Sequence, residues 1–321
     1  MGFIQQMKSS VIKGKQMTAE EAAALSCLEL DELCSAADEI REHFCGNAFD
    51  ICTIINGKSG KCSENCVYCA QSEHYCTEIE EFPLLSGEFL LKEASYNEKK
   101  GILRFSVVTS GPRLSGSEFD EICKSYRMLH KHTNISVCAS NGLLSLQQFK
   151  TLKASGVTRY HNNLETSRRY FPYICTTHTY EDKIRTIKNA MEAGLEVCSG
   201  GIMGLGETME DRIDMAMDIR TLGIKSVPVN ILNPIEGTPL AKMPELSDDE
   251  VLRIVALYRF ILPDAAIRMA GGRRLLRDKG LGVFKSGANA AISGDMLTTS
   301  GVCIDDDLKM LNELGFEVKR I

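Results

Sequence analysis

Short apolar runs rich in β-branched residues alternate along most of this chain with longer segments whose apolar residues recur at helical spacing. The eight strand-like runs are 49–56, 102–110, 135–141, 158–165, 196–204, 226–234, 265–272 and 287–294. Regular alternation of strands and helices favours a parallel sheet with right-handed crossovers. Eight such units predict an α/β fold, a (β/α)8 TIM-type barrel.

The helical segments carry clear start and stop signals. The segments 145–156 and 179–194 each open on Ser or Thr and close on Gly, which are the residue types preferred at the two ends of a helix. Ser247 and Glu250 have the spacing of a capping box at the start of a further helix.

The division into domains follows from this pattern. Thr18 and Glu21 have capping-box spacing within an N-terminal helical extension, residues 1–45. The barrel domain is expected over residues 46–321. A doubly wound sheet is the competing arrangement, but its dinucleotide fingerprint, G-x-G-x-x-G at the start of the first helix, is missing.

Composition narrows the class of protein. Of 321 residues, 44% are hydrophobic and 25% charged, which is typical of an enzyme-sized globular domain. The net charge of −6 disfavours nucleic acid as a partner. No apolar run is long enough for a membrane span and no secretory signal is present, so we expect a cytoplasmic protein. Thirteen cysteines, an odd number, then argue against a disulfide framework.

Three of these cysteines form the pattern C-x-x-x-C-x-x-C: Cys62, Cys66 and Cys69. Zinc is the alternative to an iron–sulfur cluster, but structural zinc sites use four ligands, usually in two knuckles. His74 and Cys76 are the nearest extra ligands and lack knuckle spacing. Three thiolates would hold three irons of a [4Fe–4S] cluster and leave the fourth iron open to an external ligand.

The triplet resembles the motif of the radical S-adenosylmethionine (SAM) superfamily, and Tyr68 before the last cysteine matches it too. The glycine-rich segment 200–208, GGIMGLGET, is similar to the superfamily's motif beside the adenosyl group. The resemblance implies a [4Fe–4S] cluster whose open iron binds SAM, and cleavage of SAM to a 5′-deoxyadenosyl radical. Such cofactors supply chemistry that side-chain acids and bases cannot.

A narrower resemblance, to the biotin synthase family, extends from about residue 45 to about residue 300. It rests on the segments HNNLETS (161–167), TTHTYEDK (176–183), VCSGGIMGLGET (197–208), VPVNILNPIEGTPL (227–240) and IRMAGGR (267–273). It implies insertion of sulfur into dethiobiotin, with sulfur taken from an auxiliary iron–sulfur cluster. It also implies a reductant such as flavodoxin or ferredoxin, and a homodimer.

Polar residues gather late in the predicted strands, where a parallel barrel places its active site. By the resemblance, Asn163 and Glu165 match positions that hold the SAM ribose, and Asn230 matches a position that contacts the ureido ring of dethiobiotin. Lys183 matches a basic residue near the SAM carboxylate, and Gly204 belongs to the adenosyl motif.

The resemblance also implies ligands for the auxiliary cluster: Cys138, Cys198 and Arg268 match three of the family's four positions. The fourth position is Ser106, and a serine alkoxide is a poor ligand for iron in a cluster that favours soft thiolates.

A substitute thiol is therefore expected. Cys175, directly before the motif at 176–183, is the first candidate, and Cys76 is the second. A buried structural role for Cys175 is an equal alternative. The changed ligand set leaves the cluster open between a [2Fe–2S] form and a larger four-iron form with an extra sulfide.

Two other functions compete with this interpretation. Another radical SAM enzyme of the same barrel type, such as a hydrogenase-cofactor maturase or a methylornithine-type mutase, would share the triplet but would not require Cys138, Cys198 and Arg268 in one cavity. A non-catalytic iron–sulfur carrier would have no use for an open iron or for an adenosyl motif.

Overall fold

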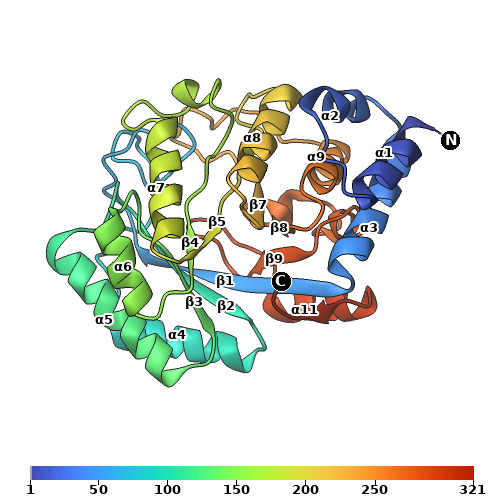
Figure 1. Cartoon of the computed structure of the whole chain (residues 1–321). Coiled ribbons are helices and arrows are strands. Elements are labelled where there is room, and N and C mark those ends of the chain that lie inside the picture. Colours follow the sequence, from blue (N-terminus) through green and yellow to red (C-terminus); the bar gives the residue numbers. More distant parts are fainter. Residues whose placement is uncertain (1) are drawn as a thin grey trace.

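Parallel strands close into a barrel in the computed structural model, which describes residues 2–321 (Figure 1). The strands are β1 (Ala48–Lys58), β2 (Arg104–Thr109), β3 (Ser136–Ser140), β4 (Arg159–His161), β5 (Glu196–Cys198), β6 (Gly201–Met203), β7 (Ser226–Ile231), β8 (Ala266–Met269) and β9 (Ala290–Ser293). Neighbouring strands pair in parallel in the order β1-β2-β3-β4-β5-β7-β8-β9, with β6 also paired to β7, and β1 pairs with both β2 and β9. The (β/α)8 prediction is confirmed, and the open doubly wound sheet is excluded.

The fifth barrel strand is interrupted. β5 and β6 both pair with β7, and Ser199 and Gly200 separate them. Close packing explains the two glycines at the interruption. A Cβ atom on Gly200 would lie 1.9 Å from the carbonyl oxygen of Pro228, and one on Gly201 would lie 2.4 Å from that of Glu165.

Helices cover the outside of the barrel. They are α4 (Gly87–Lys99), α5 (Gly116–His132), α6 (Leu146–Ala154), α7 (Tyr180–Glu192), α8 (Met209–Thr221), α9 (Asp248–Ile261), α10 (Leu281–Phe284) and α11 (Ile304–Glu313), with 3-10 turns at Phe171–Tyr173 and Arg273–Leu275. Thr179 and Ser145 cap α7 and α6 in full capping boxes, as predicted. Ser247 caps α9, but Glu250 does not return the bond, because its carboxylate accepts from Arg212 at 2.6 Å.

Three helices precede the first strand: α1 (Phe3–Ile12), α2 (Ala19–Ser26) and α3 (Leu30–Cys45). The capping box of Thr18 and Glu21 is present at the start of α2. Apolar side chains of these helices form a second buried cluster with Ala256, Leu257 and Phe260 of α9, on the side of the barrel seen at the right of Figure 1. Over residues 2–321, no helix is long and apolar enough to cross a membrane.

The end of the chain adds a strand that the sequence pattern did not predict. β10 (Glu317–Val318) follows α11 and lies parallel to the start of β1, outside the closed barrel. The paired residues are Ala48 with Glu317 and Phe49 with Val318. The C-terminus is thereby fixed to the same strand that closes the barrel.

Replacing Gly200 with alanine tests the interrupted strand. The added methyl group would overlap the Pro228 carbonyl, so we expect Gly200→Ala to lower the free energy of unfolding by about 2 kcal/mol. Urea unfolding followed by circular dichroism measures this. Gly2→Ala is the control, because its new Cβ would meet its nearest neighbour at 3.7 Å. Equal stability of the two variants would contradict the packing argument.

Candidate functional site

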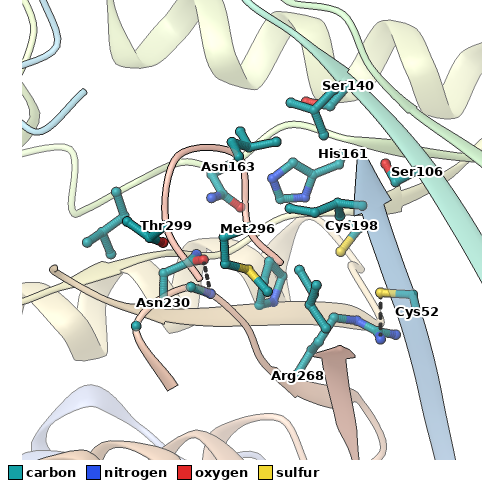
Figure 2. Close-up of a pocket in the computed structure, with 18 of the residues that line it drawn as sticks. Cys52, Ser106, Ser140, His161, Asn163, Cys198, Asn230, Arg268, Met296 and Thr299 are labelled. Carbon is teal, nitrogen blue, oxygen red and sulfur yellow. Dashed lines mark hydrogen bonds between the residues drawn. The ribbon is translucent and has the colours of Figure 1, made fainter. Parts of the chain in front are cut away.

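A cavity of about 360 Å³ occupies the interior of the barrel, and alternate residues of nearly every strand line it (Figure 2). Strand residues point to opposite faces in turn, so each strand contributes every second side chain. The polar or sulfur-bearing residues of this lining on the strands are Cys52, Arg104, Ser106, Cys138, Ser140, Arg159, His161, Cys198, Asn230 and Arg268.

Three thiols and one guanidinium meet in this cavity. Cys138 and Cys198, both predicted from the sequence, lie there with Arg268. The third thiol is Cys52 of β1, which the sequence analysis missed. Nη1 of Arg268 donates a hydrogen bond to Sγ of Cys52 at 3.2 Å, drawn as a dashed line in Figure 2. Cys52 was recognisable as a member of a predicted strand, in step with Asp50 and Ile54 on one face.

The two substitute thiols expected from the sequence do not line the cavity. Cys175 follows the 3-10 turn Phe171–Tyr173, and its sulfur contacts the loop that carries the cysteine triplet. Cys76 is exposed in the same loop. Ser106 does line the cavity and pairs in register with Cys138. These positions correct the expectation that Cys175 or Cys76 replaces the missing inner thiol, because Cys52 already occupies the inner face of the neighbouring strand.

A buried carboxylate organises the charges next to the thiols. Asp50 is fully buried and pairs with Arg268 at 2.8 Å and with Arg104 at 2.9 Å, while Arg159 lies 3.9 Å away. Burial opposes ionisation of Asp50, but these three guanidinium groups outweigh it and lower its pKa to about 2. Glu196, more than half exposed, is the further anion near Arg159, at 2.9 Å. The region therefore holds an excess of positive charge.

The inner thiols differ in how readily they ionise. Burial raises the pKa of Cys52, and it raises that of Cys138 to about 12. Burial also opposes ionisation of Cys198, but a hydrogen bond with His161 and the charges of His161, Arg268 and Arg159 lower its pKa to about 6. Because metals bind the thiolate, ligation here would displace protons, most easily from Cys198.

The cysteine triplet lies in the loop after β1. Its backbone is held by hydrogen bonds from Cys62 N to Gln71 O at 3.1 Å and from Cys69 N to Cys66 O at 3.0 Å. Burial raises the pKa of Cys62 and raises that of Cys69 to about 11.

The spread of these sulfurs bears on the metal. Among residues 2–321, the three-residue group of His, Cys, Asp or Glu whose ligand atoms all lie within 4.8 Å is Cys66, Cys175 and His178, not the triplet. A single zinc ion with Zn–S bonds of about 2.3 Å would bring its sulfurs to about 3.8 Å from one another. The wider spread of the triplet fits a multi-iron cluster better than one ion.

Residues between the outer loop and the inner thiols form the predicted SAM site. Tyr68, Asn163 and Glu165 all line the cavity. Asn163 Nδ2 donates to the Glu165 carboxylate at 3.2 Å, and the Gly200 amide donates to Asn163 Oδ1 at 3.1 Å. Glu165 has a φ of 73°, a left-handed conformation that costs a non-glycine residue energy and that recurs at ligand sites. The Glu165 carboxylate is thus held at the cavity wall, where it keeps acceptor sites for a further donor.

The remaining predicted site residues differ in whether they line the cavity. Asn230 lines the cavity and is oriented by two bonds, to Gly201 O at 3.0 Å and from Gly271 N at 2.9 Å, which leave one donor and one acceptor site of its amide for a ligand. Gly204 does not line the cavity; it turns the chain at φ 100°. Lys183 also lies outside the lining, and its charge acts on Cys66 and His178.

Comparison with known families agrees with this geometry. Residues 58–219 match the radical SAM superfamily, and residues 228–317 match the biotin and thiamin synthesis associated domain. The first match contains the cysteine triplet, and the second contains Asn230 and Arg268.

Curated relatives are similar over the whole chain. A biotin synthase of Akkermansia muciniphila is 64% identical over 319 residues, covering 99% of both chains. A biotin synthase of Clostridium botulinum is 56% identical over 318 residues, covering 99% of this chain and all of its own. One from Brachyspira hyodysenteriae is 54% identical over 316 residues, covering 98% of this chain and 95% of its own.

Solved structures share the fold at low identity. Methylornithine synthase PylB has a TM-score of 0.85 and 19% identity, covering 98% of this chain and 97% of its own. The [FeFe]-hydrogenase maturase HydG has a TM-score of 0.84 and 22% identity, covering 98% of this chain and 74% of its own. These two likenesses bear on the barrel alone.

Replacing Asp50 with asparagine tests the buried charge cluster. Three guanidinium groups would lose their counter-ion, so we expect Asp50→Asn to lower the free energy of unfolding by about 3 kcal/mol at pH 7. Because the pKa of Asp50 is depressed in the folded chain, its contribution is present above pH 3.8 and is lost as pH falls through about 2.

Urea unfolding between pH 7 and pH 2 should therefore show the two stability curves converging at the acid end. Asp264→Asn, which removes an exposed pair with Lys225, is the control and should change stability little. Parallel curves for wild type and Asp50→Asn down to pH 2 would contradict the assignment.

Proposed function

Because this chain belongs to the biotin synthase family, we propose that it inserts sulfur into dethiobiotin to form biotin, as a radical SAM sulfurtransferase. The observation that carries the proposal is the meeting of Cys52, Cys138 and Cys198 with Arg268 in the cavity that Tyr68, Asn163 and Glu165 also line. With these assignments, a sulfur source and a SAM site would share one enclosed space. The maturase and mutase alternatives share the barrel but have no use for a second set of thiols inside it.

The cofactors are a [4Fe–4S] cluster, SAM and an auxiliary iron–sulfur cluster. When bound, they supply a carbon radical able to remove hydrogen from unactivated C–H bonds, and the sulfur that replaces it. The part of the protein is to hold these groups, to orient the substrate between them and to keep the radical from solvent. The strand residues around the cavity are suited to this because the barrel fixes their positions.

We assign the outer cluster to Cys62, Cys66 and Cys69. Their sulfurs are too dispersed for a single ion, and three thiols leave one iron of a four-iron cluster for SAM. Asn163 and Glu165 would hold the ribose through the oriented amide and carboxylate. Lys183 would contribute favourable charge near the SAM carboxylate, and Gly204 would shape the turn beside the adenosyl group.

We assign the inner cluster to Cys52, Cys138 and Cys198. Both Nη atoms of Arg268 are engaged, Nη1 with Asp50 O at 2.9 Å and Ala291 O at 3.0 Å, and Nη2 with the Asp50 carboxylate. The neighbouring charges of Cys52 and Asp50 outweigh burial and raise the pKa of Arg268, so its guanidinium stays protonated. A protonated guanidinium has no lone pair for iron, and we therefore place Arg268 as a hydrogen-bond donor to Cys52.

The inner site has three thiols, the same number as the outer site. The form that fits them is a four-iron cluster with one iron open to an extra sulfide, because a [2Fe–2S] unit ordinarily takes four protein ligands. The positive charge around Asp50 favours such an anionic group at this depth of the barrel.

Substrate and partners follow from the same assignment. The free donor and acceptor sites of the Asn230 amide suit the ureido group of dethiobiotin. A small reductant protein such as flavodoxin or ferredoxin would supply electrons to the outer cluster. We also propose that the chain acts as a homodimer in the cytoplasm, on the strength of the family resemblance.

Anaerobic turnover tests the reaction. Reconstituted protein incubated with SAM, a strong reductant and dethiobiotin should yield biotin and about two 5′-deoxyadenosine per biotin, since one radical is needed for each of two C–H bonds. Mass spectrometry of the products measures both. Deoxyadenosine without biotin would point to another radical SAM reaction, and absence of both products would point to a cluster carrier.

Iron content tests the inner ligand set. We expect Cys52→Ala to lose the inner cluster and to retain about four irons per chain in the outer one. Ser106→Ala changes the residue that pairs in register with Cys138, and it should keep the iron and sulfide content of wild type. Cys175→Ala should keep it too, since that thiol lies outside the cavity. Full iron content in Cys52→Ala would remove Cys52 from the ligand set.

A further inference from the structure

The loop 294–302, between β9 and α11, forms part of the cavity wall. Four consecutive loop residues line the cavity: Met296, Leu297, Thr298 and Thr299. Thr299 belongs to the same lining as Asn163 and Asn230, the residues assigned to SAM and to the substrate (Figure 2). The position of this loop therefore sets part of the shape of the space in which those ligands would meet.

Hydrogen bonds hold the loop near its middle and at its base. Asn56 Nδ2 of β1 donates to Leu297 O at 3.1 Å. At the base, the Gly294 amide donates to Val302 O at 2.8 Å, and a Cβ atom on Gly301 would lie 1.8 Å from Gly294 O. The two ends of the loop thus lie against each other, so a group that fixes both ends fixes the loop.

A buried carboxylate joins the two ends. Asp307, in the first turn of α11, is 1% exposed. Its Oδ2 accepts from the hydroxyl of Ser293, the residue before the loop, at 2.6 Å. The same hydroxyl lies 3.4 Å from Val302 O at the far end of the loop. One carboxylate and one hydroxyl therefore connect β9, the last loop residue and α11.

Arg273 fixes the orientation of that carboxylate. Its Nη1 donates to Asp307 Oδ1 at 2.8 Å and its Nη2 to Oδ2 at 2.5 Å, which makes a bidentate pair. Nη1 also donates to Lys279 O at 3.0 Å, so the arginine itself is held in place. Arg273, Met296 and Val302 line one small cavity of about 10 Å³. The loop therefore lies against the arginine as well as being bonded to its partner.

We propose that the Arg273–Asp307 pair, acting through Ser293, positions the loop 294–302 and thereby sets the affinity of the cavity for dethiobiotin and its closure to solvent. The inference rests on the proposed function for the identity of the substrate. All three are positioning residues, because they lie outside the lining of the large cavity and reach it through the loop. A loosened loop would spend less time in the binding conformation, which weakens the apparent affinity by that fraction. It would also admit solvent, so SAM would be spent without forming biotin.

Hydrogen exchange and product ratios test the inference on full-length, anaerobically reconstituted protein. Ser293→Ala removes the hydroxyl between Asp307 and the loop but leaves the Arg273–Asp307 pair intact. We expect the peptide 294–302 to exchange its amide hydrogens faster, and 5′-deoxyadenosine per biotin to rise above the wild-type ratio. The half-saturating dethiobiotin concentration should rise about fivefold, the size expected for one lost hydrogen bond. Mass spectrometry measures the exchange and both products.

Asp307→Asn is the second variant. It leaves the buried Arg273 without its counter-charge, so it should show the same three changes more strongly, together with a lower free energy of unfolding. Ser125→Ala is the matched control, because Ser125 is also buried and its hydroxyl bonds a backbone carbonyl, Glu121 O at 3.1 Å, within α5. It should match wild type in loop exchange, half-saturation and product ratio.

The outcomes separate the inference from the function beneath it. Wild-type exchange, half-saturation and product ratio in Ser293→Ala would overturn the inference. So would an Asp307→Asn protein that is less stable but keeps the wild-type half-saturation and ratio, because the pair would then serve the fold alone. Absence of biotin from wild type would instead overturn the proposed function, while exchange of the peptide 294–302 would still decide whether Ser293 holds the loop.

Discussion

The pairing of β1 with both β2 and β9 is the constraint on which the rest of the molecule depends. It closes the barrel. In the closed barrel, every second side chain of each strand points into one shared interior. Cys52 and Arg268 are separated by 216 positions in the sequence, yet closure brings them to 3.2 Å. The thiols of Cys52, Cys138 and Cys198 would not share one space in an open sheet, because β1, β3 and β5, which carry them, are not neighbours in the strand order.

Closure also gathers positive charge inside the barrel, and Asp50 is the buried counter-ion to that charge. Three arginines point toward one end of the interior, and desolvation would penalise each of them without a counter-ion. Asp50 offsets part of that charge while leaving a positive excess. Arg268 and Arg159 also add to the hydrogen bond and charge of His161, which together lower the pKa of Cys198 against the effect of burial. The buried arginines thus serve the fold and the thiols together, and a neutral apolar interior could not hold an anionic cluster.

Much of this was predictable from the sequence, and the failures share one cause. Strand positions, most helix caps and two inner thiols followed from local pattern and from family motifs. Cys52 was missed because its role is set by register between strands, which no local pattern encodes. Proximity in sequence instead favoured Cys175 as the substitute thiol, because it directly precedes the motif 176–183, which was expected near the barrel mouth. The β5 interruption and β10 likewise depend on tertiary packing, at Pro228 and at the start of β1.

The position of Cys175 shows why a cysteine count cannot define a ligand set. The outer loop needs three thiols and has them, so a fourth thiol beside Cys66 is not required to bind iron. At the inner site, Arg268 likewise lies beside a thiol without being needed as a ligand, because its guanidinium donates a hydrogen bond to the Cys52 sulfur at 3.2 Å.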